Sequence, residues 1–175
     1  EYGVSFPLIF KSFGDFKPGL YIYLATPFVK LFGLNEISTR LPSIIIGSLL
    51  PLLLFLTIRA IYPNSKHLPL ISAIILTFNP FNIHYSRMAW ETNVLTFELL
   101  LASLLFIKKR HLFSAIVFGL TLYTYQAGKM ISLLLIIILL TINLQQIKKQ
   151  LNKFILKFVF PLAIMTIPVL YGLLF

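Results

Sequence analysis

The sequence HYSRMAWE at residues 84–91 is a short polar island between two almost wholly apolar stretches. It holds one cation, Arg87, and one anion, Glu91, while residues 68–83 before it and 94–107 after it are apolar. Because a charge in the middle of a bilayer costs about 2.5–3.5 kcal/mol even on a lenient insertion scale, the pair is expected at a membrane face. The island therefore predicts a tight turn between two membrane helices.

The overall composition is that of an integral membrane protein. Of the 175 residues, 58% are hydrophobic and only 11% are charged, and the mean hydropathy is +0.92; soluble domains carry about 25% charged residues. The fold class predicted is all-α and membrane-embedded, a polytopic helical bundle. No cysteine occurs and the three histidines are scattered, so neither disulfides nor a His/Cys metal site is expected. Because the chain starts at Glu1 without Met and ends in an apolar run, we interpret it as an internal piece of a longer protein.

Residues 1–40 are expected to form an extracytoplasmic loop. Within them, residues 19–34 are apolar but contain Pro27 and Lys30, and at about 1.5 Å per residue a helix there reaches roughly 24 Å. The hydrocarbon core is about 30 Å thick, so an interfacial helix is predicted, with a seventh span as the competing interpretation. Residues 35–40 are interpreted as a polar connector.

Residues 41–175 are predicted to form the transmembrane region. Six helices are expected, at about 41–62, 68–83, 92–107, 112–126, 130–143 and 158–175. Asn79-Pro80 predicts a break near the end of the second helix. Residues 112–143 could also form one long helix, but a break at QAGK (126–129) is preferred because it keeps the flanking basic clusters on one side of the membrane.

The distribution of charge predicts which ends of these helices share a membrane face. With six alternating spans, nine of the 15 Lys and Arg residues fall on one side, including the clusters at 108–110 and 148–157, and six fall on the other. Loops rich in cations are cytoplasmic as a rule, so the second side is expected to be extracytoplasmic. The surplus of cations also accounts for the net charge of +10 without a nucleic-acid partner.

The expected extracytoplasmic face gathers acids, bases and aromatic side chains. They are Asp15, Lys17, Arg40, Arg87, Glu91 and Lys129, with Tyr21, Tyr85, Trp90, Tyr123 and Tyr125 nearby. Lys and Arg can hold a phosphate diester and stabilise it as a leaving group, and a carboxylate can serve as a general base. The structural alternative is headgroup contact, or an ion pair between Arg87 and Glu91 at i, i+4 spacing. Glu98, an acid within a span, is a functional candidate by default, with a paired structural role as the alternative.

Four stretches resemble motifs of membrane glycosyltransferases of the GT-C fold, in the protein O-mannosyltransferase-like and aminoarabinose-transferase-like families. GDFKPGLYIYL (14–24) resembles their KPPLYYWL segment, and LFG (31–33) followed by TRLPS (39–43) resembles their entry into a span. NP (79–80) with SRMAWETN (86–93), and LYTYQAGK (122–129), resemble two further turns. The resemblance covers roughly residues 1–145, with the motifs in the same order.

This resemblance implies a polytopic enzyme that transfers a sugar from a polyprenyl-phosphate donor to an acceptor at the extracytoplasmic face of the cytoplasmic membrane. Its partners would be the donor lipid and membrane lipids, and its essential Asp is expected upstream of residue 1. By motif match, Lys17 contacts the lipid phosphate and Glu91 is a supporting acid. Arg87 and Lys129 are assigned to the same phosphate or to the sugar phosphate. Further candidates are Asp15, Tyr21 and Tyr125. No cofactor is indicated, although a divalent cation is compatible with the pattern.

The main alternative is a non-enzymatic transporter or lipid-flippase segment whose cations bind headgroups. Such a protein needs a polar path through the membrane, and only Glu98, Asn79 and a few Ser and Thr residues offer one. An O-antigen ligase or polymerase shares polyprenyl-linked substrates, but the Lys-Pro and Arg-Leu-Pro-Ser motifs argue against it. The sequence leaves the sugar, the acceptor and the oligomeric state undetermined.

Overall fold

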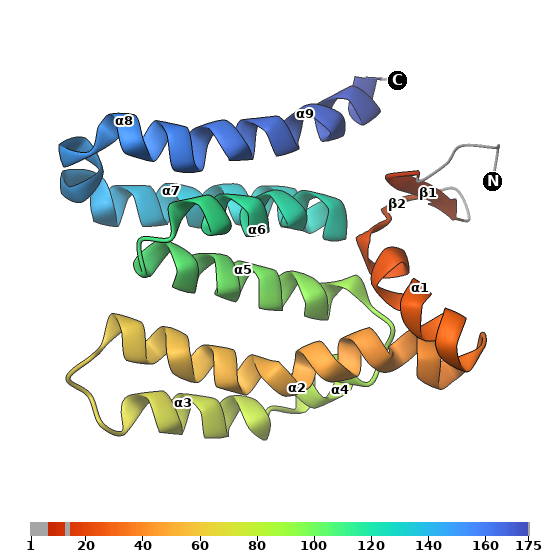
Figure 1. The fold of residues 1–175 in the computed structure, drawn as a ribbon. Helices are drawn as coiled ribbons and strands as arrows, with labels where there is room; N and C mark the ends of the chain where they lie inside the picture. Colours follow the sequence, from red (N-terminus) through yellow and green to blue (C-terminus); the bar gives the residue numbers. More distant parts are fainter. Residues whose placement is uncertain (1–6, 13–14, 175) are drawn as a thin grey trace.

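A bundle of long helices lying side by side, with a small β-hairpin at one end, makes up the molecule (Figure 1). The computed structural model describes residues 7–12 and 15–174. In chain order the elements are β1 (Ile9–Ser12), β2 (Asp15–Pro18), α1 (Leu20–Phe32), α2 (Glu36–Ile61), α3 (Leu68–Thr77), α4 (Pro80–Ser86), α5 (Glu91–Ile107), α6 (His111–Thr124), α7 (Gln126–Lys149), α8 (Leu151–Phe154), the π-helical turn η1 (Ile155–Val159) and α9 (Phe160–Leu174).

Several of these helices have the length and composition of membrane spans. In the described part of the chain, α2, α7 and the continuous segment Leu151–Val169 are each long and apolar enough to cross a membrane. A fourth span results if α4 and α5, whose axes are bent by 115°, act as one broken span. Helices α1, α3 and α6 are apolar but shorter. The chain is thus a helical membrane protein, while the arrangement of six spans remains a prediction.

The N-terminal loop contains a two-stranded antiparallel hairpin that the sequence analysis did not anticipate. Its strands pair with Phe10 opposite Lys17, and the turn residues 13–14 lie outside the described residues, as does Glu1. The hairpin is fixed to α1, because the Tyr23 hydroxyl donates to the Pro7 carbonyl at 2.7 Å. Gly19 permits this close approach, since a Cβ there would lie 2.6 Å from the Phe10 ring.

The first long helix begins five residues earlier than expected. Asn35 caps α2: its Oδ1 accepts from the Ser38 N–H at 2.9 Å, and Ser38 Oγ accepts from the Asn35 N–H at 3.2 Å. This reciprocal capping box satisfies N–H groups that would otherwise lack partners at the helix start. Residues 36–40 are therefore the first turns of a helix, and their interpretation as a connector was wrong.

The predicted break at Asn79-Pro80 is confirmed. Helix α3 ends at Thr77, and α4 begins at Pro80 with Asn79 as its cap; Asn79 Oδ1 accepts from the Phe81 N–H at 2.8 Å. The tight turn expected over residues 84–91 is shorter, because α4 continues to Ser86 and only residues 87–90 connect it to α5.

The predicted reversal between the fourth and fifth helices also occurs, with a shifted break. Helix α6 ends at Thr124 and α7 starts at Gln126, so the chain reverses at Tyr125 and residues 126–129 form the first turn of α7. Helix α7 runs on to Lys149 rather than ending at 143, and the last helical segment starts at Leu151 rather than 158. The sequence analysis placed the polar residues near these helix ends in loops, whereas in the structure they belong to the helices.

The core lies between α5, α6 and η1. Ala102 and Ala115 are fully buried, and Ser114 Oγ donates to the Ala102 carbonyl at 2.8 Å. Small residues at such contacts let two helices approach closely, which is how helices associate in membranes. Phe118 and Phe158 close the core with an edge-to-face contact of 6.3 Å between ring centroids.

Candidate functional site

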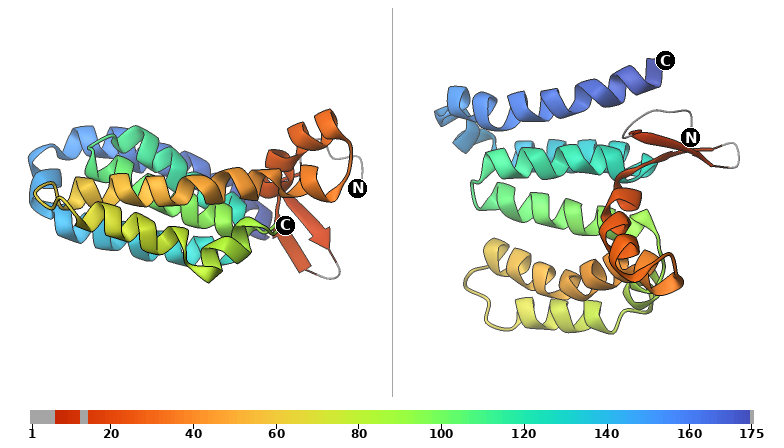
Figure 2. Two further views of the ribbon diagram at one scale, coloured as in Figure 1. Left: turned by 90° about the horizontal axis from the view of Figure 1, so that it is seen from below. Right: turned by 45° about the vertical axis from the view of Figure 1, so that its right-hand side comes forward.

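The elements that carry the predicted site residues meet at one end of the bundle, which we call the mixed-charge end (Figures 1 and 2). Lys17 is exposed on β2, and Arg87 is exposed in the connection after α4. Glu91, the first residue of α5, and Lys129, in the first turn of α7, are half-buried. Strand β2 contacts α6, and α5 contacts both α4 and α7. Tyr125 is exposed at the reversal between α6 and α7 at this same end.

The opposite end, which we call the basic end, gathers the remaining cations. It contains the connection between α2 and α3, the connection between α5 and α6, and the junction of α7 with α8 (Figure 1). Its Lys and Arg residues are Arg59, Lys66, Lys108, Lys109, Arg110, Lys148, Lys149, Lys153 and Lys157. In the part of the chain that the structure describes, the Lys and Arg residues thus fall at two ends of the bundle, as the charge distribution predicted, and the side of the membrane that each end faces stays a prediction.

Arg87 and Glu91 do not form the ion pair that the sequence left open as an alternative. Among the described residues, the one ion pair within 4.0 Å joins Arg40 to Glu36 at 3.8 Å. Helix α4 ends at Ser86 and α5 begins at Glu91, so the two residues do not have the i, i+4 geometry of a single helix. The Glu91 carboxylate instead lies in the first turn of α5, where the helix dipole favours a negative charge.

A buried polar network supports the backbone next to Glu91. The Tyr21 hydroxyl donates to the Thr39 carbonyl at 2.9 Å and lies 3.1 Å from Ser43 Oγ. Asn93 Nδ2 donates to the Ser43 carbonyl at 2.9 Å. The network therefore joins α1, α2 and α5 at the point where α5 begins.

Tyr21 takes part in this network rather than facing solvent, since it is only 6% exposed. Burial raises the pKa of Tyr21, so its hydroxyl stays protonated and remains a hydrogen-bond donor. We therefore assign Tyr21 a positioning role instead of contact with substrate. Asp15 pairs through its backbone with Ser12 in the hairpin, and its side chain lies outside the described part of the structure.

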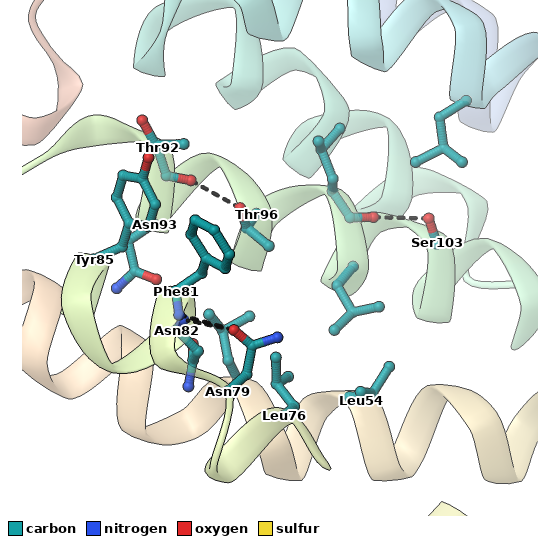
Figure 3. A pocket seen from close by; sticks show the side chains of 14 residues that line it. Leu54, Leu76, Asn79, Phe81, Asn82, Tyr85, Thr92, Asn93, Thr96 and Ser103 are labelled. Atoms are coloured by element: carbon teal, nitrogen blue, oxygen red, sulfur yellow. Dashed lines mark hydrogen bonds between the residues drawn. The ribbon is translucent and has the colours of Figure 1, made fainter. Parts of the chain in front are cut away.

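A pocket of about 590 Å³ opens beside this network, between α2, α3, α4 and α5 (Figure 3). Most of its polar lining comes from α4 with its cap and from the start of α5, next to the mixed-charge end: Asn79, Asn82, Tyr85, Thr92, Asn93 and Thr96. Ser103 adds a hydroxyl to the pocket further along α5. Its apolar lining is mostly leucine: Leu50, Leu54, Leu76, Leu99, Leu100 and Leu135. Such a combination suits an amphipathic ligand, with a polar head among the Asn and Thr groups and an alkyl tail along the leucines.

Sequence reasoning found some of the polar residues of this pocket and missed others: Asn79 stood in a quoted motif and Tyr85 was placed at the extracytoplasmic face. Thr92 and Asn93 belong to the SRMAWETN stretch, but Asn82 and Thr96 stood in no motif. Thr92 and Thr96 are one helical turn apart, and this i, i+4 spacing in an otherwise apolar helix was the available signal.

A protein-family model matches most of this chain. The family model described as "Dolichyl-phosphate-mannose-protein mannosyltransferase" matches residues 17–171. This chain belongs to that family. The match begins at Lys17 and includes every other predicted site residue except Asp15. No curated protein and no solved structure gives a significant match.

Membership of the mannosyltransferase family places the chain among membrane glycosyltransferases of the GT-C type. The resemblance noted in the motifs is confirmed by this match, which extends past residue 145 to residue 171. The described residues contain no group of three or more His, Cys, Asp or Glu side chains that could hold a metal ion.

Proposed function

We propose that this chain forms the donor-binding part of a membrane glycosyltransferase that takes a sugar from a polyprenyl-phosphate carrier. The family match supports the class of reaction. The observation that supports the assignment to this donor is the pocket of about 590 Å³, which combines Asn and Thr side chains with a leucine-rich wall. One of its lining residues, Tyr85, is two positions from the exposed Arg87. A polyprenyl-phosphate sugar has the same division, with an anionic head and a long apolar tail.

Lys17, Arg87 and Lys129 would act on the phosphate of the donor. Charge-assisted hydrogen bonds from Lys and Arg to phosphate oxygens are strong, and they strengthen further as the phosphate gains charge on leaving. None of the three is held in an ion pair within the described residues. Their amine and guanidinium groups are therefore available to an incoming phosphate.

The reaction would be a direct displacement at the anomeric carbon of the sugar. The acceptor hydroxyl oxygen forms the new bond to this carbon, and the bond from the carbon to the phosphate oxygen breaks with its electron pair passing to the phosphate. The hydroxyl proton goes to a carboxylate base, which we expect to be an Asp upstream of residue 1. Glu91 would support this step by orienting the acceptor or one of the cations.

The mixed-charge end is proposed to face the extracytoplasmic side of the cytoplasmic membrane. The basic end carries nine Lys and Arg residues and would be cytoplasmic by the positive-inside rule. In this arrangement the bundle crosses the membrane six times, with α1 lying at the interface.

The full-length protein allows a direct test of these roles by measuring transfer of labelled sugar from a polyprenyl-phosphate donor. Lys17→Ala should lower the transfer rate roughly 100-fold, as expected when a donor to the leaving group is removed. Glu91→Ala should lower it by a similar factor, roughly 100-fold. Matched controls are Lys30→Ala and Glu36→Ala, which remove exposed charges from α1 and α2 and should stay within about twofold. Wild-type rates for Lys17→Ala and Glu91→Ala would remove both residues from the site.

A further inference from the structure

A second pocket, of about 520 Å³, lies at the basic end of the bundle. It is lined by the C-terminal end of α5, whereas the N-terminal end of α5 lies at the mixed-charge end. Four lysines line it, from the α5–α6 connection, the end of α7, α8 and η1: Lys109, Lys149, Lys153 and Lys157. Gln146 and Gln150 add amide groups to the same wall. The pocket is therefore built from hydrogen-bond donors that come from four separate elements.

A histidine lines the same pocket as these lysines. Lys109, Lys153 and Lys157 all exert an electrostatic effect on His111, which also lines the pocket. The His111 ring is held edge-on between Phe106 and Phe154, with centroid distances of 5.2 Å to each. Nδ1 of His111 is buried without a hydrogen-bond partner among the described residues. The lysines thus share the pocket with three packed aromatic rings, those of Phe106, His111 and Phe154.

The lining of this pocket, as the described residues form it, contains no acidic side chain. The sequence contains no Asp or Glu after Glu98, and the one described ion pair, Arg40 with Glu36, is on α2. Like charges that share a pocket repel one another unless an anion lies between them. An anion bound in the pocket would supply the counter-charge that its lining lacks.

We propose that this basic pocket binds a phosphate-bearing anion. Lysines supply point charges for phosphate oxygens, and basic pockets between membrane helices on the cytoplasmic side are suited to anionic lipid headgroups. Three apolar residues that directly follow lining residues in the chain are exposed: Leu144, Leu151 and Ile155. They would lie along the acyl chains of a bound lipid, so a headgroup is the expected source of the phosphate, and free phosphate is the other source. This site is separate from the proposed donor site and does not depend on transfer activity.

Binding to the purified full-length protein in detergent tests this proposal, with phosphatidylglycerol as probe and phosphatidylcholine as the zwitterionic comparison. The pocket variant is Lys149→Gln with Lys153→Gln. The matched control is Lys108→Gln with Lys148→Gln, which makes the same change in net charge at the same end but at residues that do not line the pocket. We expect the pocket variant to bind phosphatidylglycerol about tenfold more weakly and the control to stay within about twofold.

A charge-conserving variant and a competition experiment complete the test. Lys149→Arg with Lys153→Arg should retain binding, because it keeps both charges. If millimolar inorganic phosphate competes with phosphatidylglycerol, free phosphate is a ligand; if it does not compete, the lipid headgroup is the ligand. Equal losses in the pocket variant and the control would mean unspecific attraction to the basic end and would overturn the proposal, as would unchanged binding in the pocket variant.

Discussion

Glu98 is a buried acid in the apolar interior of the bundle, and the structure explains how it is accommodated. It is 6% exposed, and its Oε2 accepts a hydrogen bond from Thr124 Oγ1 at 2.6 Å. A buried carboxyl group is costly unless it is hydrogen-bonded. This contact joins α5 to the end of α6, so of the two roles left open by the sequence, the structure favours the paired structural one.

Removing the partner of Glu98 should therefore destabilise the protein. Thr124→Val deletes the hydroxyl and leaves the buried carboxyl group without this bond, which should lower the free energy of unfolding by about 1–3 kcal/mol. Thermal unfolding in detergent measures the change, with Thr141→Val as the control because Thr141 is exposed and bonds only to its own helix. Glu98→Gln can accept the same hydrogen bond and should keep most of the transfer activity. Loss of activity in Glu98→Gln at unchanged stability would indicate that Glu98 acts in the reaction.

At the scale of single residues, the sequence identified the charged side chains better than their partners. The motifs singled out Lys17, Arg87, Glu91 and Lys129, and the structure brings their elements to one end. The sequence alone could not show that Tyr21 is buried against Ser43, because the two residues are 22 positions apart and meet only through the packing of α1 on α2. Nor could the sequence alone show that Arg87 follows α4 while Glu91 belongs to α5.

At the scale of elements, the packing of α2 on α4 and α5 holds the connection between Ser86 and Glu91 in place. Gly47 lies at this crossing: a Cβ there would overlap the Ser86 side chain and approach Asn93 Nδ2 to 2.9 Å. Glycine thus permits the close approach that brings the end of α4 next to the polar network at the start of α5.

Gly47→Ala should force these helices apart. Overpacking of a close contact costs about 1–3 kcal/mol, so the free energy of unfolding should fall by that amount, as measured by thermal unfolding in detergent. The transfer rate should fall as well, since the shift displaces the residues next to Arg87. Ser48→Ala is the control, because Ser48 is the next residue and is exposed. Unchanged stability in Gly47→Ala would contradict the close packing of α2 on α4.

The sequence predicted a helix boundary correctly where the boundary depends only on residues that are adjacent in the chain. Asn79-Pro80 ends one helix and caps the next, and both functions follow from the two side chains themselves. The hairpin at residues 9–18 was missed because its strands are four residues long and gain their stability from packing on α1. The start of α2 was missed because the capping pair Asn35 and Ser38 also occurs in polar loops.

At the scale of the whole molecule, charge patterning predicted more than hydropathy did. The stretch from 112 to 143 is apolar throughout most of its length, and hydropathy alone is compatible with one long helix. The requirement that both basic clusters share a face predicted a reversal, and the structure has one at Tyr125. Pockets between elements could not be predicted in this way, since their linings combine residues from four or more separate segments.

The central claim is that the mixed-charge end and the basic end lie on opposite sides of the membrane, with the donor site at the former. Cysteine labelling tests it, because these 175 residues contain no cysteine; any cysteine elsewhere in the full-length protein is first replaced by serine. Ala89 and Ala127 are exposed reporters for the mixed-charge end, and Asn64 and Gln150 for the basic end. Gly128 is unsuitable, since a Cβ there would approach the Thr121 carbonyl to 2.7 Å.

The deciding measurement is the reaction of these four single-cysteine variants of the full-length protein with a membrane-impermeant maleimide on intact cells. The account predicts that Ala89→Cys and Ala127→Cys are labelled from outside, whereas Asn64→Cys and Gln150→Cys are labelled only after the cells are permeabilised. If Ala89→Cys and Ala127→Cys were labelled from opposite sides, Arg87, Glu91 and Lys129 could not share one aqueous site, and the proposed sugar transfer at this end would be contradicted.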